Sequence, residues 1–319
     1  MNKLNVVSFC DGSSTGQYVL RKLFPQVSLD YHAFELDDKA MYVSQKHFPN
    51  TKHYGDLRNW RSGVLQIDGS PDLFLAGTSC KNTSNAGDRT GFATLTGVPV
   101  TSLDQYIHNV SQGIEMNESG VCFWESIWFI RTVKPKHVFF EIPLLNKKFL
   151  DIFIKETGLN YIMIDSGLVS AQSRKRWYFT NIPNLRQPED RNITIDSVIP
   201  GAVAYSKHGS YNPLSETDPS IKKYSKIRTI KRKDGKMNTI VTSPCTTNQV
   251  YLPDGTIRTI TVEEAELFMG YTPGHTQHPK LSNRARYRIL GNGWSIPVIE
   301  HIFEGLKYSD VFKQNLVTV

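Results

Sequence analysis

Residues 4–23 read LNVVSFCDGSSTGQYVLRKL, and this stretch decides the class of fold. The apolar run Leu4–Phe9 predicts a buried strand, and Thr15–Leu23 has the periodicity of a helix. The turn between them contains Gly12, and such a turn lets the backbone approach a ligand at the helix N-terminus. The spacing is not GxGxxG, so a cofactor site and a purely structural turn both stay open at this point.

Later segments repeat the same spacing of strands and helices up to about residue 180. Further strands are expected at His32–Glu35, Asp72–Ala76, His137–Glu141, Tyr161–Ile164 and Trp177–Thr180, with a short one ending near Asp56. Helices are expected from about Asp38 to Phe48 and over Trp124–Val133. This alternation predicts an α/β fold in which a doubly wound, Rossmann-like sheet carries helices on both faces.

The chain changes character after residue 181. Prolines at positions 183, 188, 200, 213 and 219 interrupt a polar, basic region, and Asp254-Gly255 is a hairpin signal. We expect a first domain over residues 1–180, completed by residues 282–319, and a second, irregular domain over residues 181–281. Residues 85–118 form a long polar segment, which is typical of a lid or a binding loop.

Composition excludes several classes of protein. The chain has 319 residues, 39% of them hydrophobic and 21% charged, which excludes a disordered chain, a collagen and a coiled coil. No apolar run approaches the roughly 20 residues of a membrane span, and the N-terminus lacks the pattern of a signal peptide. We therefore expect a cytoplasmic protein with no membrane partner. In that reducing compartment its four cysteines would be reactive or buried rather than bridged.

Positive charge is concentrated in two segments. Lys and Arg number 37 against 30 Asp and Glu, a net charge of +7, and residues 222–236 hold eight cations against the single Asp234. Residues 171–177 add Arg174, Lys175 and Arg176. Such stripes suit a polyanion such as nucleic acid, but charge alone fits a solvated face equally well.

Chemically reactive side chains follow two of the predicted strands. Cys80 comes shortly after the strand Asp72–Ala76, beside Lys81, where a lowered thiol pKa would make it a nucleophile. The alternative is a small buried apolar residue. Glu141 ends the strand His137–Glu141, at the sheet edge where open α/β folds place their sites. If residues 172–176 are extended, Arg174 and Arg176 point the same way and suit a phosphate or a base oxygen.

The order of these segments resembles the ordered motifs of DNA cytosine-5 methyltransferases. Two later segments strengthen the resemblance: residues 258–271, RTITVEEAELFMGY, and residues 282–299, SNRARYRILGNGWSIPVI, which resemble the family's closing motifs. With Lys226–Ile230, this ending is closest to the animal de novo DNA methyltransferases. The resemblance covers about residues 4–308, and the lack of accessory segments fits a compact bacterial or phage enzyme, for instance one of restriction-modification.

The resemblance implies S-adenosyl-L-methionine as the methyl donor, with S-adenosyl-L-homocysteine as its product. In the family's pattern, Glu35 holds the ribose and Asp56 the adenine. The other positions that match cofactor-binding residues are Asp11, Gly12, Thr15, Gly16, Asn292, Trp294 and Ser295. No metal ligand is implied.

The resemblance also assigns the chemistry. Cys80 would attack carbon 6 of a cytosine flipped out of double-stranded DNA, and Glu141 would contact ring nitrogen 3 and the exocyclic amine. Arg176, with Arg174, would engage the base oxygen or a phosphate. The residues expected on DNA phosphates are Lys226, Arg228, Lys231 and Arg232. The sequence predicts neither the target sequence nor the oligomeric state.

Departures from the family pattern keep other functions open. Ser79 stands where the family has Pro, Lys81 where it has Gln or Asn, and Ile142 where it has Asn. A catalytically silent DNA-binding or regulatory module, and a methyltransferase acting on RNA cytosine, are therefore alternatives. Cys245, in Ser243-Pro244-Cys245, repeats the family's Pro-Cys dipeptide but lacks the preceding strand, so we assign the nucleophile to Cys80.

Overall fold

The computed structural model of the chain describes residues 3–67, 69–78, 90–211, 224–242 and 248–313, with the backbone alone over 206–211, 224–231 and 312–313. The chain forms two compact units. The first comprises Met1–Ile164, Lys175–Pro188 and Val298–Val319, and the second comprises Asp165–Arg174 and Glu189–Pro297. These boundaries follow packing and differ from the predicted domain limits at residues 180 and 281.

The first unit is built on a seven-stranded sheet with the order β3-β2-β1-β4-β5-β7-β6. Its strands are β1 (Lys3–Phe9), β2 (Ser28–Phe34), β3 (Lys52–His53), β4 (Leu73–Gly77), β5 (His137–Ile142), β6 (Asn160–Asp165) and β7 (Lys175–Thr180). β1 pairs in parallel with β2 and β4, β2 pairs in parallel with β3, and β4 with β5. β7 is antiparallel to β5. The predicted α/β fold is confirmed.

This strand order creates a switch point between β1 and β4. From β1 the chain proceeds outward through β2 to β3, and then returns to the other side of β1 to form β4. In open α/β sheets, ligands bind at the carboxyl ends of the two strands where the order reverses. Phe9 ends β1 and Gly77 ends β4, so the residues that follow each of them lie at this position.

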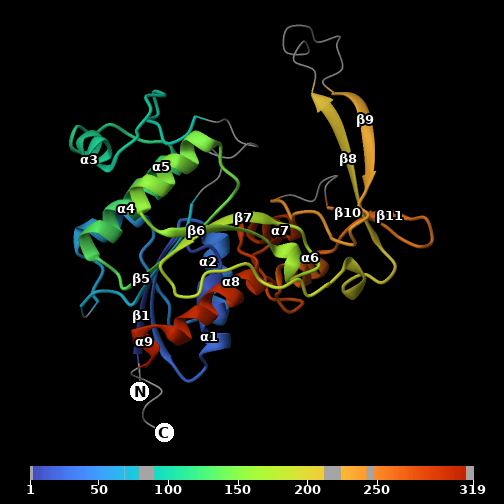
Figure 1. Cartoon of the computed structure of the whole chain (residues 1–319), viewed down its shortest axis with the longest axis horizontal. Coiled ribbons are helices and arrows are strands. Elements are labelled where there is room, and N and C mark those ends of the chain that lie inside the picture. The colour runs from blue at the N-terminus through green and yellow to red at the C-terminus, as the bar shows by residue number, and fades with distance from the viewer. Residues whose placement is uncertain (1–2, 68, 79–89, 212–223, 243–247, 314–319) are drawn as a thin grey trace. The chain divides into compact units, whose positions relative to one another are not determined.

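Helices cover both faces of the sheet (Figure 1). They are α1 (Thr15–Leu23), α2 (Asp38–His47), α3 (Leu103–Ser111), α4 (Glu118–Val133), α5 (Lys147–Thr157), α8 (Ile296–Phe303) and α9 (Asp310–Lys313). Apolar residues of α4 and α5 share one cluster with alternate residues of the strands, among them Phe9, Phe74 and Phe140. On the opposite face, Phe139 of β5 contacts Phe303 of α8, and an ion pair joins α1 to α8.

Two helical segments differ from the prediction. The polar segment 85–118 contains α3, whose first turn is capped by the Ser102 hydroxyl accepting from the Gln105 N–H at 3.3 Å. α4 begins at Glu118, whereas its pattern had predicted Trp124 as the first residue. The Asn117 side chain accepts from the Gly120 N–H at 2.8 Å, and this cap starts the helix across Ser119 and Gly120, which are poor helix formers.

The second unit contains a four-stranded antiparallel sheet with the order β11-β10-β8-β9. Its strands are β8 (Val203–Tyr211), β9 (Tyr224–Lys231), β10 (Gln249–Tyr251) and β11 (Ile257–Thr259), and its helices are α6 (Val262–Met269) and α7 (Asn283–Asn292). The hairpin predicted at Asp254-Gly255 is confirmed, because the Leu252 N–H donates to the Thr256 carbonyl at 2.9 Å and joins β10 to β11. Within the described ranges, no helix is long and apolar enough to cross a membrane.

Candidate active site at the carboxyl edge of the first sheet

The turn after β1 is tied to the end of β2. The Asp11 N–H donates to the Phe34 carbonyl at 3.3 Å, and the Gly12 N–H donates to Oε2 of Glu35 at 2.7 Å. Gly12 has a φ of +60°, a left-handed conformation that glycine adopts without a steric penalty. The turn therefore places a backbone amide directly beside a carboxylate at the switch point.

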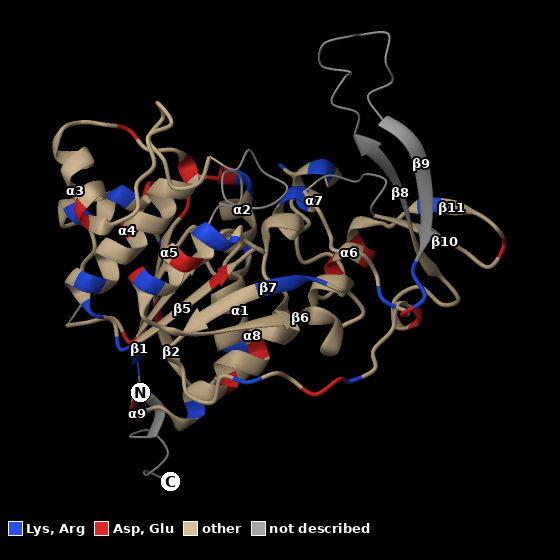
Figure 2. Cartoon of the chain, turned by 45° about the horizontal axis from the view of Figure 1, so that its top comes forward, with Lys and Arg blue, Asp and Glu red and all other residues tan. Residues whose placement is uncertain are grey.

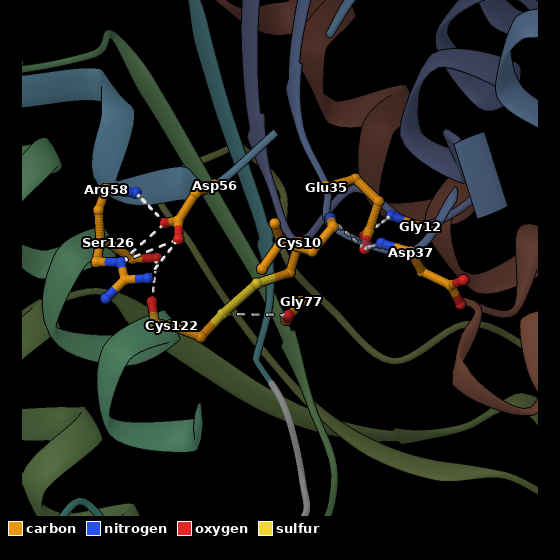
Figure 3. The surroundings of a disulfide bond; sticks show 10 residues. Cys10, Gly12, Glu35, Asp37, Asp56, Arg58, Gly77, Cys122 and Ser126 are labelled. Atoms are coloured by element: carbon orange, nitrogen blue, oxygen red, sulfur yellow. Dashed lines mark hydrogen bonds and ion pairs between the residues drawn. A yellow bond between two sulfur atoms is a disulfide. The ribbon is translucent and has the colours of Figure 1, made fainter. Parts of the chain in front are cut away.

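Glu35 accepts hydrogen bonds from three backbone N–H groups (Figure 3). Besides the Gly12 amide, its Oε1 accepts from the N–H groups of Leu36 and Asp37, both at 2.8 Å. Burial raises the pKa of Glu35, and the backbone donors partly oppose that rise. A carboxylate offers about four acceptor positions, so capacity remains for a further donor such as a ribose hydroxyl.

Asp11 and Asp56, the other two predicted cofactor carboxylates, are bonded within the protein. The Asp11 side chain is buried and accepts from the hydroxyls of Ser14 and Tyr31, the latter at 2.7 Å. Burial raises the pKa of Asp11. Asp56 caps the 3₁₀ turn Leu57–Ser62 and accepts from Nε of Arg58 at 3.0 Å, and this bond lowers the pKa of Asp56.

The two remaining predicted cofactor residues of this unit lie in the first turn of α1. Thr15 begins the helix and Gly16 follows, and both are buried. Their backbone amides belong to the helix N-terminus, which carries partial positive charge.

Glu141 and Arg176 form an ion pair at the same edge of the sheet. Because β7 is antiparallel to β5, its first residues lie where β5 ends, and Glu141 is paired in register with Tyr178. Nε of Arg176 lies 3.1 Å from Oε1 of Glu141, and the two side chains are only 17% and 7% exposed. β7 begins with two cations, seen in blue in Figure 2. The pair sets a cation beside a nearly buried carboxylate.

Arg174 donates to backbone carbonyls, whereas Arg176 pairs with the Glu141 carboxylate and also donates to the Lys175 carbonyl at 2.8 Å. The Arg174 guanidinium donates to three carbonyl oxygens of the second unit, those of Ile240 at 3.1 Å, Gly291 at 3.0 Å and Gly293 at 2.9 Å. The side chain is buried. The two arginines therefore share none of these partners, and a catalytic role for Arg174 stays a prediction.

The segment predicted to close the cofactor pocket ends α7. Asn292 is the last residue of the helix, Gly293 caps it, and Trp294 and Ser295 are buried. Two carbonyls of this segment accept from Arg174. The Ser295 hydroxyl is buried and has no hydrogen-bond partner among the described residues. These residues belong to the second unit, so their assignment to the cofactor still rests on the sequence.

Several predicted residues lie outside what the structure describes. These are Ser79, Cys80, Lys81 and Cys245, together with the side chains of Lys226, Arg228 and Lys231 on β9. Arg232 is described, and its Nε donates to Oδ1 of Asp234 at 2.9 Å. That bond raises the pKa of Arg232 and lowers the pKa of Asp234. Among the described residues, no group of His, Cys, Asp or Glu is suited to a metal ion.

A disulfide bond joins Cys10 to Cys122 (Figure 3). The expectation of unbridged cysteines is therefore wrong for this pair. The two residues are 112 positions apart, and the fold brings the end of β1 next to the first turns of α4, which no local pattern reveals. Cys10 lies in the turn after β1, which is predicted to bind the cofactor.

Solved structures of methyltransferases match this chain over almost its whole length. The methyltransferase EhMeth of Entamoeba histolytica has a TM-score of 0.57 at 15% identity, and the match covers 97% of this chain and 99% of EhMeth. The Dnmt2 methyltransferase of S. pombe has a TM-score of 0.54 at 11% identity, with 96% and 99% covered. A DNMT2 variant of Spodoptera frugiperda has a TM-score of 0.55 at 12% identity, and the match covers 95% of this chain and 99% of that protein.

The chain has the methyltransferase fold. Sequence identities of this size establish a common fold and leave the reaction to be argued from the residues. No family model matches the sequence. In the methyltransferase fold of this chain, the turn after β1, Glu35 and the Glu141–Arg176 pair all lie at the carboxyl edge of one sheet.

Proposed function

We propose that the protein is a cytosine-5 methyltransferase that uses S-adenosyl-L-methionine and modifies DNA through a covalent adduct at Cys80. The observation that carries this proposal is the Glu141–Arg176 pair at the sheet edge where β4 also ends. β4 ends at Gly77, and Cys80 follows three residues later in the sequence. A nucleophile, a carboxyl group and a guanidinium are the groups that this reaction requires.

Cys80 supplies the covalent step. Carbon 5 of cytosine is a poor nucleophile, so the thiolate first adds to carbon 6 and turns the ring into an enamine. Carbon 5 then takes the methyl group, which the cofactor supplies from its sulfonium. A base, for which the sequence assigns no residue and a water molecule is a candidate, then takes the proton from carbon 5. The bond between carbon 6 and the Cys80 sulfur breaks in the same elimination and releases the methylated base. The target base must leave the stack for this attack, at a cost of a few kcal/mol.

Glu141 and Arg176 act on the base itself. A carboxyl group held at a fixed position can bond ring nitrogen 3 and the exocyclic amine, and so stabilise the charge that develops as Cys80 adds. Arg176 keeps Glu141 in place through the 3.1 Å contact. One N–H group of its guanidinium donates to the Lys175 carbonyl at 2.8 Å, and the others are proposed to bond a base oxygen or a phosphate. The pair therefore needs no large rearrangement to receive a cytosine.

Residues of the first unit fit the adenosyl part of the cofactor. Glu35 retains acceptor capacity for a ribose hydroxyl, and the Gly12 amide holds it in place. Asp56 is engaged by Arg58, an exposed side chain, so an adenine amine can replace that partner at small cost. Asn292, Trp294 and Ser295 are proposed for the same ligand, and the unpartnered Ser295 hydroxyl is consistent with a polar contact there.

The basic region of the second unit supports a nucleic acid as the substrate, and the resemblance of the closing motifs to those of DNA methyltransferases is the reason for proposing DNA. Residues 222–236 hold eight cations, and four of these, Lys226, Arg228, Lys231 and Arg232, are proposed to contact phosphates. Phosphate contacts position a protein without reading the sequence, so this region accounts for affinity and not for the choice of target.

The proposal is tested by methyl transfer from labelled S-adenosyl-L-methionine to double-stranded DNA and, in parallel, to RNA, with the modified base identified by mass spectrometry. Label in 5-methylcytosine of DNA is the expected result. Label in RNA alone would shift the substrate to RNA cytosine. If no methyl group reached DNA or RNA while the protein still bound DNA, a catalytically silent module would be favoured. The departures from the family pattern at Ser79, Lys81 and Ile142 are the reason for considering that alternative.

A further inference from the structure

The disulfide lies where three parts of the first unit meet. Cys10 directly follows β1 and starts the cofactor turn, while Cys122 belongs to α4. The Cys122 sulfur lies 3.6 Å from the carbonyl oxygen of Gly77, the last residue of β4 (Figure 3). One covalent bond therefore connects the proposed cofactor turn to a helix that contacts the strand leading to Cys80.

We propose that Cys10 and Cys122 form a reversible thiol-oxidation site that controls how tightly the protein binds S-adenosyl-L-methionine. The oxidised pair holds the turn in its binding conformation, and the reduced pair releases it. This inference rests on the proposed function, because it takes the turn after β1 to be part of the cofactor site.

The backbone of Cys10 explains why a bond at this residue matters. Its φ is +51°, a left-handed conformation that residues with a Cβ adopt only when their surroundings impose it. Around Cys10, the disulfide on one side and the Asp11 N–H bond to Phe34 on the other impose that conformation. Reduction removes the covalent constraint.

Relaxation of Cys10 would disturb the carboxylate that binds the ribose. Cys10 precedes Gly12 by two residues, and the Gly12 N–H donates to Oε2 of Glu35 at 2.7 Å. When the turn is free to move, this bond no longer fixes the amide and the carboxylate relative to each other. The cofactor must then bear the cost of ordering the turn, and its affinity falls.

The two cysteines differ in exposure, so the more exposed Cys10 reacts first with an external disulfide. Cys122 is only 2% exposed, whereas Cys10 is half-buried. A small disulfide such as oxidised glutathione first reacts with the Cys10 thiolate, forming a mixed disulfide and releasing one glutathione thiol. The Cys122 thiolate then displaces the second glutathione. In sum, two protein thiols lose two electrons to the oxidant and two protons pass to the released thiols.

The test measures binding of S-adenosyl-L-homocysteine by titration calorimetry, with the full chain oxidised by glutathione disulfide or reduced by dithiothreitol. Peptide mapping first establishes which cysteines are joined. The reduced protein is expected to bind about five- to tenfold more weakly, the cost of ordering one backbone residue again. Restoring the oxidant restores the affinity.

Substitutions at the two cysteines distinguish the effect of losing the disulfide from the effect of the left-handed backbone conformation at Cys10. Cys122→Ala should bind as weakly as the reduced protein and should not respond to oxidant. Cys10→Gly should bind more tightly than Cys10→Ala, because glycine adopts the left-handed conformation without a Cβ penalty. Cys245→Ser is the matched control, since it removes a cysteine and should keep the redox response.

Three results would overturn the inference. One is equal affinity in the oxidised and reduced proteins, which leaves the proposed function intact. A second is a mapped bond from Cys80 to either partner. The third is no binding by either form while circular dichroism shows a folded protein, and that result would overturn the proposed function as well.

Discussion

The proposed role of Glu141 depends on its ion pair with Arg176. Its carboxylate is almost fully buried, and Arg176 lies 3.1 Å away as its cation. Removing one partner of a buried ion pair leaves the other charge without compensation, which costs more than the pair contributes when intact. The stability of the site and its chemistry therefore depend on the same contact.

Arg176→Ala should reduce both the stability of the protein and its rate of methyl transfer. We expect the free energy of unfolding in urea to fall by about 1–3 kcal/mol, and kcat for methyl transfer to fall at least about a hundredfold. Affinity for S-adenosyl-L-homocysteine should stay unchanged, because Arg176 contacts Glu141 and not the cofactor turn. Lys175→Ala removes the exposed neighbouring cation and serves as the control. If Arg176→Ala and Lys175→Ala lost equal stability and equal kcat, positive charge at this edge of the sheet would matter and the Glu141 contact would not.

The sequence predicts some of these residues better than others. Glu141 could be placed because it ends an apolar strand, and strand ends share an edge of the sheet. The alternation over residues 172–176 predicts a direction for Arg174 but not its partners, since Ile240, Gly291 and Gly293 are distant in sequence. Partners supplied by remote segments leave no local pattern.

At the scale of elements, the turn between β1 and α1 relies on one glycine. Gly12 has a φ of +60°, and a Cβ built there meets no atom within 4 Å, so a larger residue would suffer only from its backbone conformation. Gly12→Ala should therefore cost about 1–2 kcal/mol of stability. Its affinity for S-adenosyl-L-homocysteine, measured by calorimetry, should fall too, because the amide at this position orients Glu35.

Gly12→Asn is the matched variant, because Asn tolerates the left-handed conformation better than Ala. It should lose less stability and less affinity than Gly12→Ala. If both variants bound the cofactor product as tightly as the unaltered protein, the turn would not belong to the cofactor site.

Within the second unit, Arg174 links the end of α7 to the segment that contains Ile240. Arg174→Ala leaves three carbonyls without their charged donor, and we expect it to lower the free energy of unfolding by about 2–4 kcal/mol. Arg174→Lys keeps the charge but cannot reach all three oxygens with one ammonium group, so it should restore part of the loss. Urea unfolding monitored by fluorescence measures both. No loss in Arg174→Ala would show that these bonds contribute nothing net.

Elements were predictable where apolar periodicity was strong. The helix expected from Asp38 to Phe48 is α2, and its cap on Asp37 is a local signal. The start of α4 was missed because capping by Asn117 outweighs the poor propensity of Ser119 and Gly120. α3 was missed because its residues lie within a polar stretch rich in turn formers.

For the whole molecule, three histidines of the first unit make stability depend on pH. Burial lowers the pKa values of His32, His53 and His137. A histidine whose pKa is lower when folded binds its proton more readily when unfolded, so its contribution is complete above about pH 6.5 and is lost as the pH falls. The contribution of these histidines to the urea midpoint should therefore decrease between about pH 7 and pH 5. Asp11 and Glu35, whose pKa values burial raises, act in the opposite direction.

His32 is fully buried and should account for much of this slope, because burial is the largest cause of its lowered pKa. The Asp30 carboxylate, 3.2 Å from Nε2, opposes part of that shift. His32→Gln removes the titrating group, and its unfolding free energy should vary less with pH than that of the unaltered protein. An identical slope in the variant would assign the pH dependence to other groups.

The proposed reaction depends on Cys80 being the nucleophile, and covalent trapping tests this most directly. The protein is incubated with S-adenosyl-L-methionine and duplex DNA that contains 5-fluorocytosine, whose fluorine cannot leave as a proton does. We predict a denaturation-resistant protein–DNA complex that forms with the unaltered chain and with Cys245→Ser, and that is absent with Cys80→Ser. A complex retained by Cys80→Ser, or lost in Cys245→Ser, would contradict the assignment.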